Sequence, residues 1–147
     1  MQDLDLLKVP PPGSIVVLDR PWVVPAGLEA DMKTKLPLAL RSETEALERL
    51  AAAAVDCLGI IRIVVFGSRV RGDFHGDSDL DLLVVVENLE CKDGVIHLIH
   101  DLELVYDVPL SPTLYTRHEM EENKRLGSAF FRNIESEGII VYDAEPV

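Results

Sequence analysis

The sequence predicts one α/β (α+β) domain in which helices pack on a β-sheet. Apolar residues recur at helical spacing between residues 42 and 58, whereas residues 60–66 and 80–87 are nearly continuous apolar runs, which are typical of buried strands. Helical and strand patterns alternate from there to residue 143, and this order indicates a sheet covered by helices. A chain of 147 residues is long enough to bury such a core without disulfides or a structural metal.

A proline-rich N-terminal arm, residues 1–40, precedes this domain, which we place at residues 41–147. Six of the nine prolines fall between residues 8 and 37, around the apolar runs SIVVL and PWVVP. Proline is poorly tolerated in a central strand, so these runs are predicted to be edge strands or an extended arm. Trp22 is predicted to pack the arm onto the domain or onto a second subunit, which leaves a homo-oligomer open.

The first helix of the domain is predicted over residues 42–58. Ser42 and Glu45 have the spacing of a capping box, and the helical spacing of the apolar residues gives one buried face. Gly59 stands where such a helix stops. After the two strands, a second helix is predicted with its inner face between residues 95 and 102.

Two prolines place the third strand, within residues 108–115, at an edge of the sheet. Thr116 and Glu119 repeat the capping pattern before a charged helix whose polar face is solvated. A short helix over residues 128–138 and a strand over residues 139–143 complete the predicted domain.

Charge and composition exclude several classes of function. The 14 basic and 26 acidic residues give a net charge of −12, which disfavours contact with a phosphate backbone, so we expect no extensive nucleic-acid binding. No stretch approaches the roughly 18 to 20 apolar residues of a membrane span, and the start lacks a signal-peptide pattern. We therefore expect a cytoplasmic protein that does not enter a membrane.

The candidate site lies in GSRVRGDFHGDSDLDLLVVV, which runs from Gly67 to Val86. Asp79 and Asp81 alternate where the second strand begins, and alternate residues of a strand share a face. Two carboxylates held that close repel each other, and each also carries a desolvation cost near apolar surface. The pattern therefore predicts a cation between them.

Other motifs for phosphate or metal fail at this segment. A P-loop needs lysine after its last glycine, but Asp73 follows Gly72. An EF-hand loop that starts at Asp77 needs glycine where Leu82 stands and glutamate where Asn88 stands. A GxGxxG dinucleotide fingerprint is absent.

What remains is a strand that ends at Gly67 and Ser68, a turn, and two carboxylates on the next strand. Gly67 lets the backbone approach a ligand closely, and Ser68 with the amides that follow can hold a phosphate. Arg69 and Arg71 either meet phosphate or pair with nearby acids. The two aspartates are predicted to ligate Mg²⁺, which prefers oxygen ligands and commonly bridges carboxylates to substrate phosphates.

GS followed by RxRGDxxxDSDLDLLV resembles the signature of the minimal nucleotidyltransferases in the polymerase beta-like superfamily, which is GS, a spacer, and DxD on the adjoining strand. The segments YDVPLSPTLYT and FFRNIESEGIIVYD also resemble the C-terminal half of that family, so the similarity covers roughly residues 42 to 143. The resemblance implies a mixed sheet flanked by helices, which is a nucleotidyltransferase-like fold.

The resemblance also implies an activity: Mg²⁺-dependent transfer of a nucleoside monophosphate from ATP or another nucleoside triphosphate to an acceptor hydroxyl. Carried onto this sequence, Gly67 and Ser68 hold the triphosphate, and Arg71 is a further nucleotide-binding candidate. Asp79 and Asp81 hold the metal.

A third catalytic carboxylate is expected on the neighbouring strand, where active members of the family carry a pattern like VDLVVY. The best local match is LSPTLY, which puts Ser111 at the position of the acid. Asp107 lies four residues earlier. We predict that Asp107 joins Asp79 and Asp81 as the third catalytic residue, with Ser111 as the alternative occupant of that position.

Relatives of this kind often act with a small helical HEPN protein in a toxin–antitoxin pair, in which the antitoxin can attach nucleotide to a tyrosine of the toxin. The resemblance therefore implies two functions of different classes. One is a nucleotidyltransferase whose acceptor is such a hydroxyl. The other is a non-catalytic nucleotide-binding subunit that neutralises a HEPN partner by surface recognition.

Overall fold

The computed structural model describes residues 36, 39–56, 59–72 and 79–144. Within these residues, four strands form one sheet in the order β3-β2-β1-β4. The predicted arm, with Trp22, lies outside the described residues except near its end, where Leu36 is buried in the domain core. The strands are β1 (Ile60–Phe66), β2 (Leu80–Val86), β3 (Leu110–Thr116) and β4 (Ile139–Asp143).

The sheet is mixed, as the family resemblance implied. β1 pairs antiparallel with both β2 and β4, whereas β3 runs parallel to β2. β3 lies at one edge, which confirms the prediction from Pro109, just before the strand, and Pro112 within it. β2 lies between two strands with helices on both of its faces, so every residue after Asp81 is apolar and buried.

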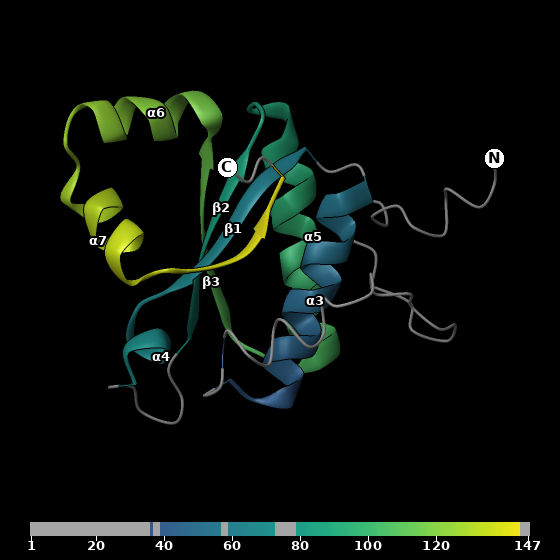
Figure 1. Cartoon of the computed structure of the whole chain (residues 1–147). Helices are drawn as coiled ribbons and strands as arrows, with labels where there is room; N and C mark the ends of the chain where they lie inside the picture. Colours follow the sequence, from purple (N-terminus) through teal and green to yellow (C-terminus); the bar gives the residue numbers. More distant parts are fainter. Residues whose placement is uncertain (1–35, 37–38, 57–58, 73–78, 145–147) are drawn as a thin grey trace.

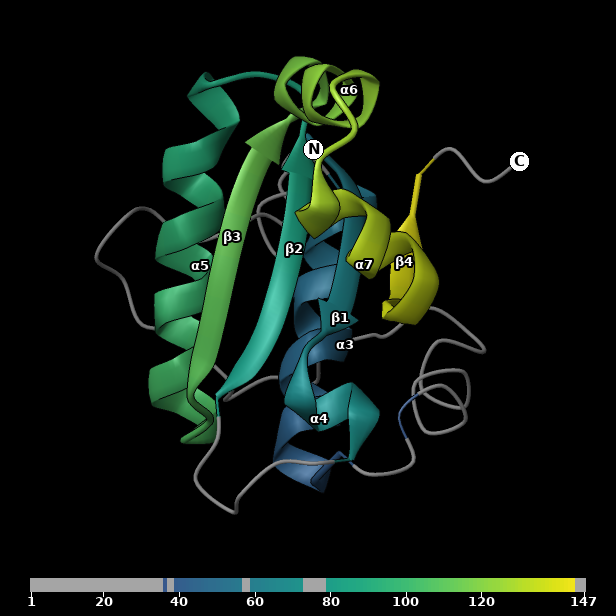
Figure 2. The same ribbon diagram turned by 90° about the vertical axis from the view of Figure 1, so that its left-hand side faces the viewer.

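Helices cover both faces of the sheet (Figures 1 and 2). One face is covered by α3 (Arg41–Asp56) and α5 (Glu90–Tyr106), and the other by α6 (Arg117–Arg125) and α7 (Ala129–Glu137). The one-turn helix α4 (Ser68–Arg71) follows β1 at the lower end of the sheet in both views. Within the described ranges, no helix has the length and apolar character that crossing a bilayer requires.

An apolar cluster is buried on each face of the sheet. Leu82 and Val84 of β2 belong to the cluster shared with α3 and α5, whereas Leu83 and Val85 pack with Phe131 of α7. Side chains alternate between the two faces of a strand. Asp81 lies two residues before Leu83, so its side chain emerges on the α7 side of the sheet.

The helices and strands predicted between residues 42 and 143 are all present, and the capping box at the start of α6 is confirmed. Thr116 Oγ1 accepts a hydrogen bond from the Glu119 N–H at 3.0 Å. Glu119 Oε1 in turn accepts from the Thr116 N–H at 2.8 Å. These two bonds satisfy backbone donors that a helix start would otherwise leave without partners.

The predicted capping box of Ser42 and Glu45 is wrong. With Ser42 as the N-cap, the first helical residue would be Glu43, but the helix begins two residues earlier, at Arg41. The Leu40 N–H therefore donates to Glu43 Oε1, at 2.7 Å, because Glu43 is the third helical residue. This shift matters for the site, since the same Glu43 carboxylate also holds an arginine of α4.

Candidate active site

The predicted glycine–serine turn and the aspartates meet where β1 ends and β2 begins. The two strands are antiparallel, and Phe66 at the end of β1 pairs with Asp81 of β2. Gly67 follows Phe66, and Ser68 opens α4. Asp79 is exposed just before β2, and Asp81 is half-buried. Sheet pairing thus brings two motifs of the sequence to one place.

Gly67 is required at this point of the chain for two reasons. Its φ of 87° and ψ of −161° lie in a region that only glycine adopts without strain. A Cβ atom there would also clash with the carboxylate of Asp81. The missing side chain therefore makes the room in which the Asp81 carboxylate lies against the turn.

Replacing Gly67 with alanine is expected to destabilise the fold by about 1–3 kcal/mol through backbone strain, and also to displace Asp81 and lower affinity for Mg²⁺-nucleotide at least tenfold. Denaturant unfolding and titration with Mg²⁺-ATP measure the two effects. Gly127→Ala is the matched control, because Gly127 also has a positive φ, of 76°, but a Cβ there meets only Arg132, at 3.6 Å. Equal losses of binding in both variants would contradict the role of Gly67.

The two arginines of α4 have different partners. Arg69 is buried, and its Nη1 and Nη2 donate to the two carboxylate oxygens of Glu43 at 2.5 and 2.6 Å. Such a bidentate pair fixes geometry, so Arg69 ties α4 to α3 rather than facing a ligand. Arg71 is exposed, and its Nη1 lies 3.5 Å from Glu137 Oε1 of α7. Arg71 remains a predicted phosphate ligand.

Electrostatics at Asp81 favour a cation. Burial raises the pKa of the Asp81 carboxyl above its usual range, and the charge of Asp79 raises it further. Arg71 acts in the opposite direction and lowers that pKa. The free protein therefore disfavours the ionised form of this carboxyl. A positive ion bound beside it would stabilise the ionised form.

The donor set at this site fits Mg²⁺. Asp79 and Asp81 offer hard oxygen ligands two residues apart at the start of β2, and Mg²⁺ is usually bound through one or two carboxylates together with substrate phosphates. Among the described residues, no group of three or more acidic, histidine or cysteine side chains could hold a metal by itself. A pair of carboxylates suits an ion that arrives with substrate phosphates, because Mg²⁺ commonly completes its shell with phosphate and water oxygens. Asp73 and Asp77 lie outside the described residues.

The position of the predicted third acid is defined by strand register. In the parallel pairing of β2 with β3, Asp81 lies opposite Ser111. Asp107 lies earlier, as the exposed left-handed residue that ends α5, with φ 55° and ψ 50°. Pairing at this end of the sheet begins at Pro109, whose carbonyl accepts from the Leu80 N–H at 3.0 Å. Ser111 thus occupies the strand position beside Asp81, and the catalytic role of Asp107 stays a prediction.

A hollow of about 250 Å³ opens beside Gly67, between the end of β1 and α7. Phe66, Phe130, Asn133 and Glu137 contribute to its lining. The motif analysis missed these residues, because none of them belongs to a phosphate or metal pattern. The sequence did contain one indication that these residues act together: Asn133 and Glu137 are four residues apart, which puts both on one face of α7.

Fold and site together define an α/β nucleotide-transfer domain with a glycine–serine turn and a two-carboxylate centre. The model of the nucleotidyltransferase domain family matches residues 45–141, and the chain belongs to this family. The family match and the GS and DxD motifs therefore agree that the chain is a nucleotidyltransferase.

Two proteins of Methanocaldococcus jannaschii are similar to the chain, and both are named, provisionally, as protein adenylyltransferases. One is 31% identical over 83 residues, which cover 54% of this chain and 77% of that protein. The other is 38% identical over 85 residues, which cover 56% of this chain and 79% of that protein.

Two solved structures resemble this chain distantly. A toxin–antitoxin structure with AMP-PNP gives a TM-score of 0.46 at 19% identity, covering 71% of this chain and 74% of that one. A provisionally named nucleotidyltransferase from Sulfolobus solfataricus gives a TM-score of 0.42 at 14% identity, covering 86% of this chain and 93% of that one.

Proposed function

We propose that this nucleotidyltransferase is a Mg²⁺-dependent adenylyltransferase that transfers AMP from ATP to a hydroxyl of a partner protein. The observation that carries the proposal is the Asp81 carboxylate, which lies against the Gly67 turn two residues after Asp79. The names of the two Methanocaldococcus jannaschii relatives support ATP as the donor and a protein as the acceptor.

Each residue of the site has a distinct task in this proposal. Gly67 and Ser68 bind the triphosphate and orient it, and Arg71 adds a positive charge at the same end of the sheet. Asp79 and Asp81 hold Mg²⁺, which when bound neutralises charge on the phosphates. Because phosphoryl chemistry needs little covalent help from a protein, positioning and charge are the main contributions of these side chains.

The transfer itself is an in-line displacement. The acceptor oxygen forms a bond to the α-phosphorus of ATP while the bond from that phosphorus to the bridging oxygen breaks, and pyrophosphate leaves. The acceptor proton must go to a base within hydrogen-bond reach. Asp107 is the candidate base, and the proposal gives it no part in holding the metal.

The proposed acceptor is a tyrosine hydroxyl of a HEPN-type partner, which follows from the resemblance of the GS and DxD motifs. One observation favours a second, non-catalytic function: Ser111, and not an acidic residue, occupies the strand position beside Asp81. Under this alternative the chain binds Mg²⁺-nucleotide and neutralises the partner by surface contact without transferring AMP.

Incubation with Mg²⁺, a HEPN partner and ATP labelled at the α-phosphate is expected to leave covalent label on a partner tyrosine. ATP labelled at the γ-phosphate is the matched control and should leave none, because that phosphate departs with pyrophosphate. Removal of the metal with a chelator should abolish labelling. Nucleotide binding without any label on the partner would instead support the non-catalytic function.

A further inference from the structure

The hollow between β1 and α7, which we call the α7 pocket, is lined by both apolar and polar side chains. Phe66, Gly67 and Arg71 line it from β1 and α4, and Phe130, Asn133 and Glu137 line it from α7. Its volume of about 250 Å³ is below the 300–1,000 Å³ usual for a site that holds a whole drug-sized ligand. The α7 pocket therefore suits one part of a larger ligand.

The α7 pocket adjoins the proposed triphosphate site. Gly67 is shared by both, since it lines the pocket and also lies against the Asp81 carboxylate. Phe66 is the strand partner of Asp81, and residues directly opposite in an antiparallel pair project to the same face. A nucleotide with its phosphates at Gly67 can therefore place its remaining parts in the pocket.

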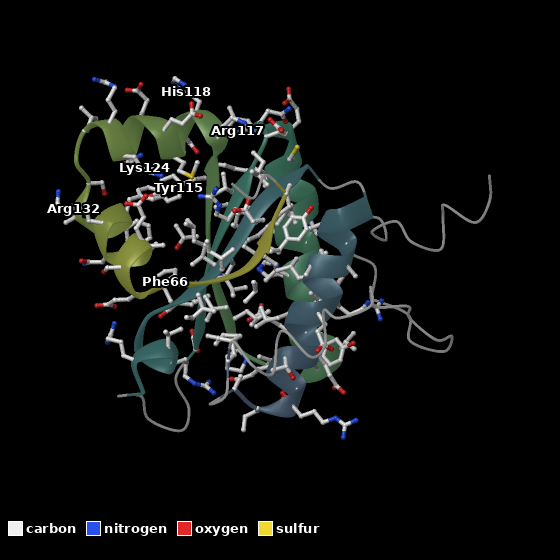
Figure 3. The ribbon with its side chains drawn as sticks, in the orientation of Figure 1. Phe66, Tyr115, Arg117, His118, Lys124 and Arg132 are labelled. Atoms are coloured by element: carbon white, nitrogen blue, oxygen red, sulfur yellow. The ribbon has the colours of Figure 1, made fainter. Side chains whose placement is uncertain are left out.

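The wall that α7 contributes is firmly packed on the sheet. Phe130 meets Phe66 edge to face with ring centroids 5.6 Å apart, and Phe131 meets Tyr115 at 5.0 Å. Figure 3 shows Phe66 and Tyr115 extending from the sheet toward α7. Phe131 and Ile134 are buried in the same cluster. Asn133 is thus presented from a helix with a fixed position, which favours selective hydrogen bonding.

The lining matches the chemistry of a nucleobase, which has apolar faces and a polar edge. Phe66 and Phe130 offer aromatic surface, and stacking of a base on such surface is favourable and tolerant of base identity. Asn133 offers a paired donor and acceptor, which matches the N6 amino group and N7 of adenine. Guanine presents two acceptors, O6 and N7, at the same edge, so the carboxamide oxygen finds no donor there and the paired contact is lost.

From this arrangement we infer that the α7 pocket binds the nucleobase of the triphosphate and that Asn133 selects adenine over guanine. Glu137 reinforces the choice when the base presents this same edge, because its carboxylate accepts from the N6 amino group of adenine and repels the O6 acceptor of guanine. Arg71 lies 3.5 Å from Glu137 and offsets the charge of that carboxylate in the pocket. The inference rests on the proposed function, and it adds the residue that determines which nucleoside triphosphate the enzyme prefers.

The test compares Mg²⁺-ATP, Mg²⁺-GTP and Mg²⁺-tripolyphosphate as probes of the full chain and of Asn133→Ala. The wild type is expected to prefer ATP to GTP. The variant should lose about tenfold in ATP affinity, the scale of one bidentate base contact, and its ATP preference should disappear. Tripolyphosphate affinity should not change, because that probe has no base.

Asn123→Ala is the matched control, since Asn123 lies on α6, donates to the Glu119 carbonyl at 2.8 Å, and does not line the α7 pocket. It should behave as the wild type with all three probes. Retention of the ATP preference by Asn133→Ala, or equal affinities of the wild type for ATP and GTP, would overturn the inference alone. Absence of binding to every probe would overturn the proposed function as well.

Discussion

The double variant Asp79→Asn with Asp81→Asn is expected to abolish Mg²⁺-dependent nucleotide binding while leaving the fold intact without metal. An amide has no negative charge to offer the ion, so both protein ligands of the proposed site are weakened together. The fold should survive because the substitution removes a partly buried charge and its repulsion from Asp79, which are the two causes that raise the pKa of Asp81. Calorimetric titration with Mg²⁺-ATP measures binding, and thermal unfolding in a chelator measures stability.

The same variant is expected to change how the stability of the metal-free protein depends on pH. A carboxyl with a raised pKa binds its proton more tightly in the folded state, so the metal-free protein loses stability as pH rises from about 3.9 through the raised pKa. The double variant should lack this part of the pH dependence. Asp93→Asn, an exposed change on α5, is the control and should retain both binding and the pH dependence. Unaltered affinity of the double variant for Mg²⁺-ATP would eliminate the site.

Much of the fold could be predicted because its signals are local. The strand over residues 60–66 is an apolar run, interrupted by Arg62 alone, between Gly59 and Gly67, and the structure reproduces those limits. The edge position of β3 followed from two prolines, which cannot donate to a neighbouring strand. The GS and DxD motifs were likewise visible, since each is a short pattern whose residues lie within one turn or strand.

Other features depend on contacts that no local pattern contains. Arg69 and Glu43 are 26 residues apart, and their pairing requires knowledge of how α3 packs beside α4. The identity of the residue beside Asp81 depends on the register between β2 and β3, which a shift by one residue would change. Asn133 is an ordinary exposed helical residue in the sequence. It becomes a candidate only because α7 packs across the end of β1.

The register between β2 and β3 also determines which residue stands where a third catalytic carboxylate is expected, and that residue is Ser111. A serine hydroxyl beside Asp81 is a poor general base at neutral pH, whereas an aspartate at that position would add a carboxylate to the pair. Asp107 is exposed at the end of α5, close in sequence to the point where β3 begins to pair with β2. Its role as the base that accepts the proton of the acceptor hydroxyl therefore stays a prediction, which a variant can test.

Asp107→Asn is accordingly expected to cut AMP transfer by about a hundredfold or more, the usual scale for loss of a general base. Its affinity for Mg²⁺-ATP should stay close to that of the wild type, because Asp107 is not among the proposed metal ligands. Ser111→Asp is the companion variant and should raise the transfer rate, since it supplies a carboxylate beside Asp81. Single-turnover labelling of the partner with α-labelled ATP separates these effects from binding. If Asp107→Asn transfers AMP at the wild-type rate, Asp107 is not the base; if only Ser111→Asp transfers AMP, the natural chain is the non-catalytic subunit.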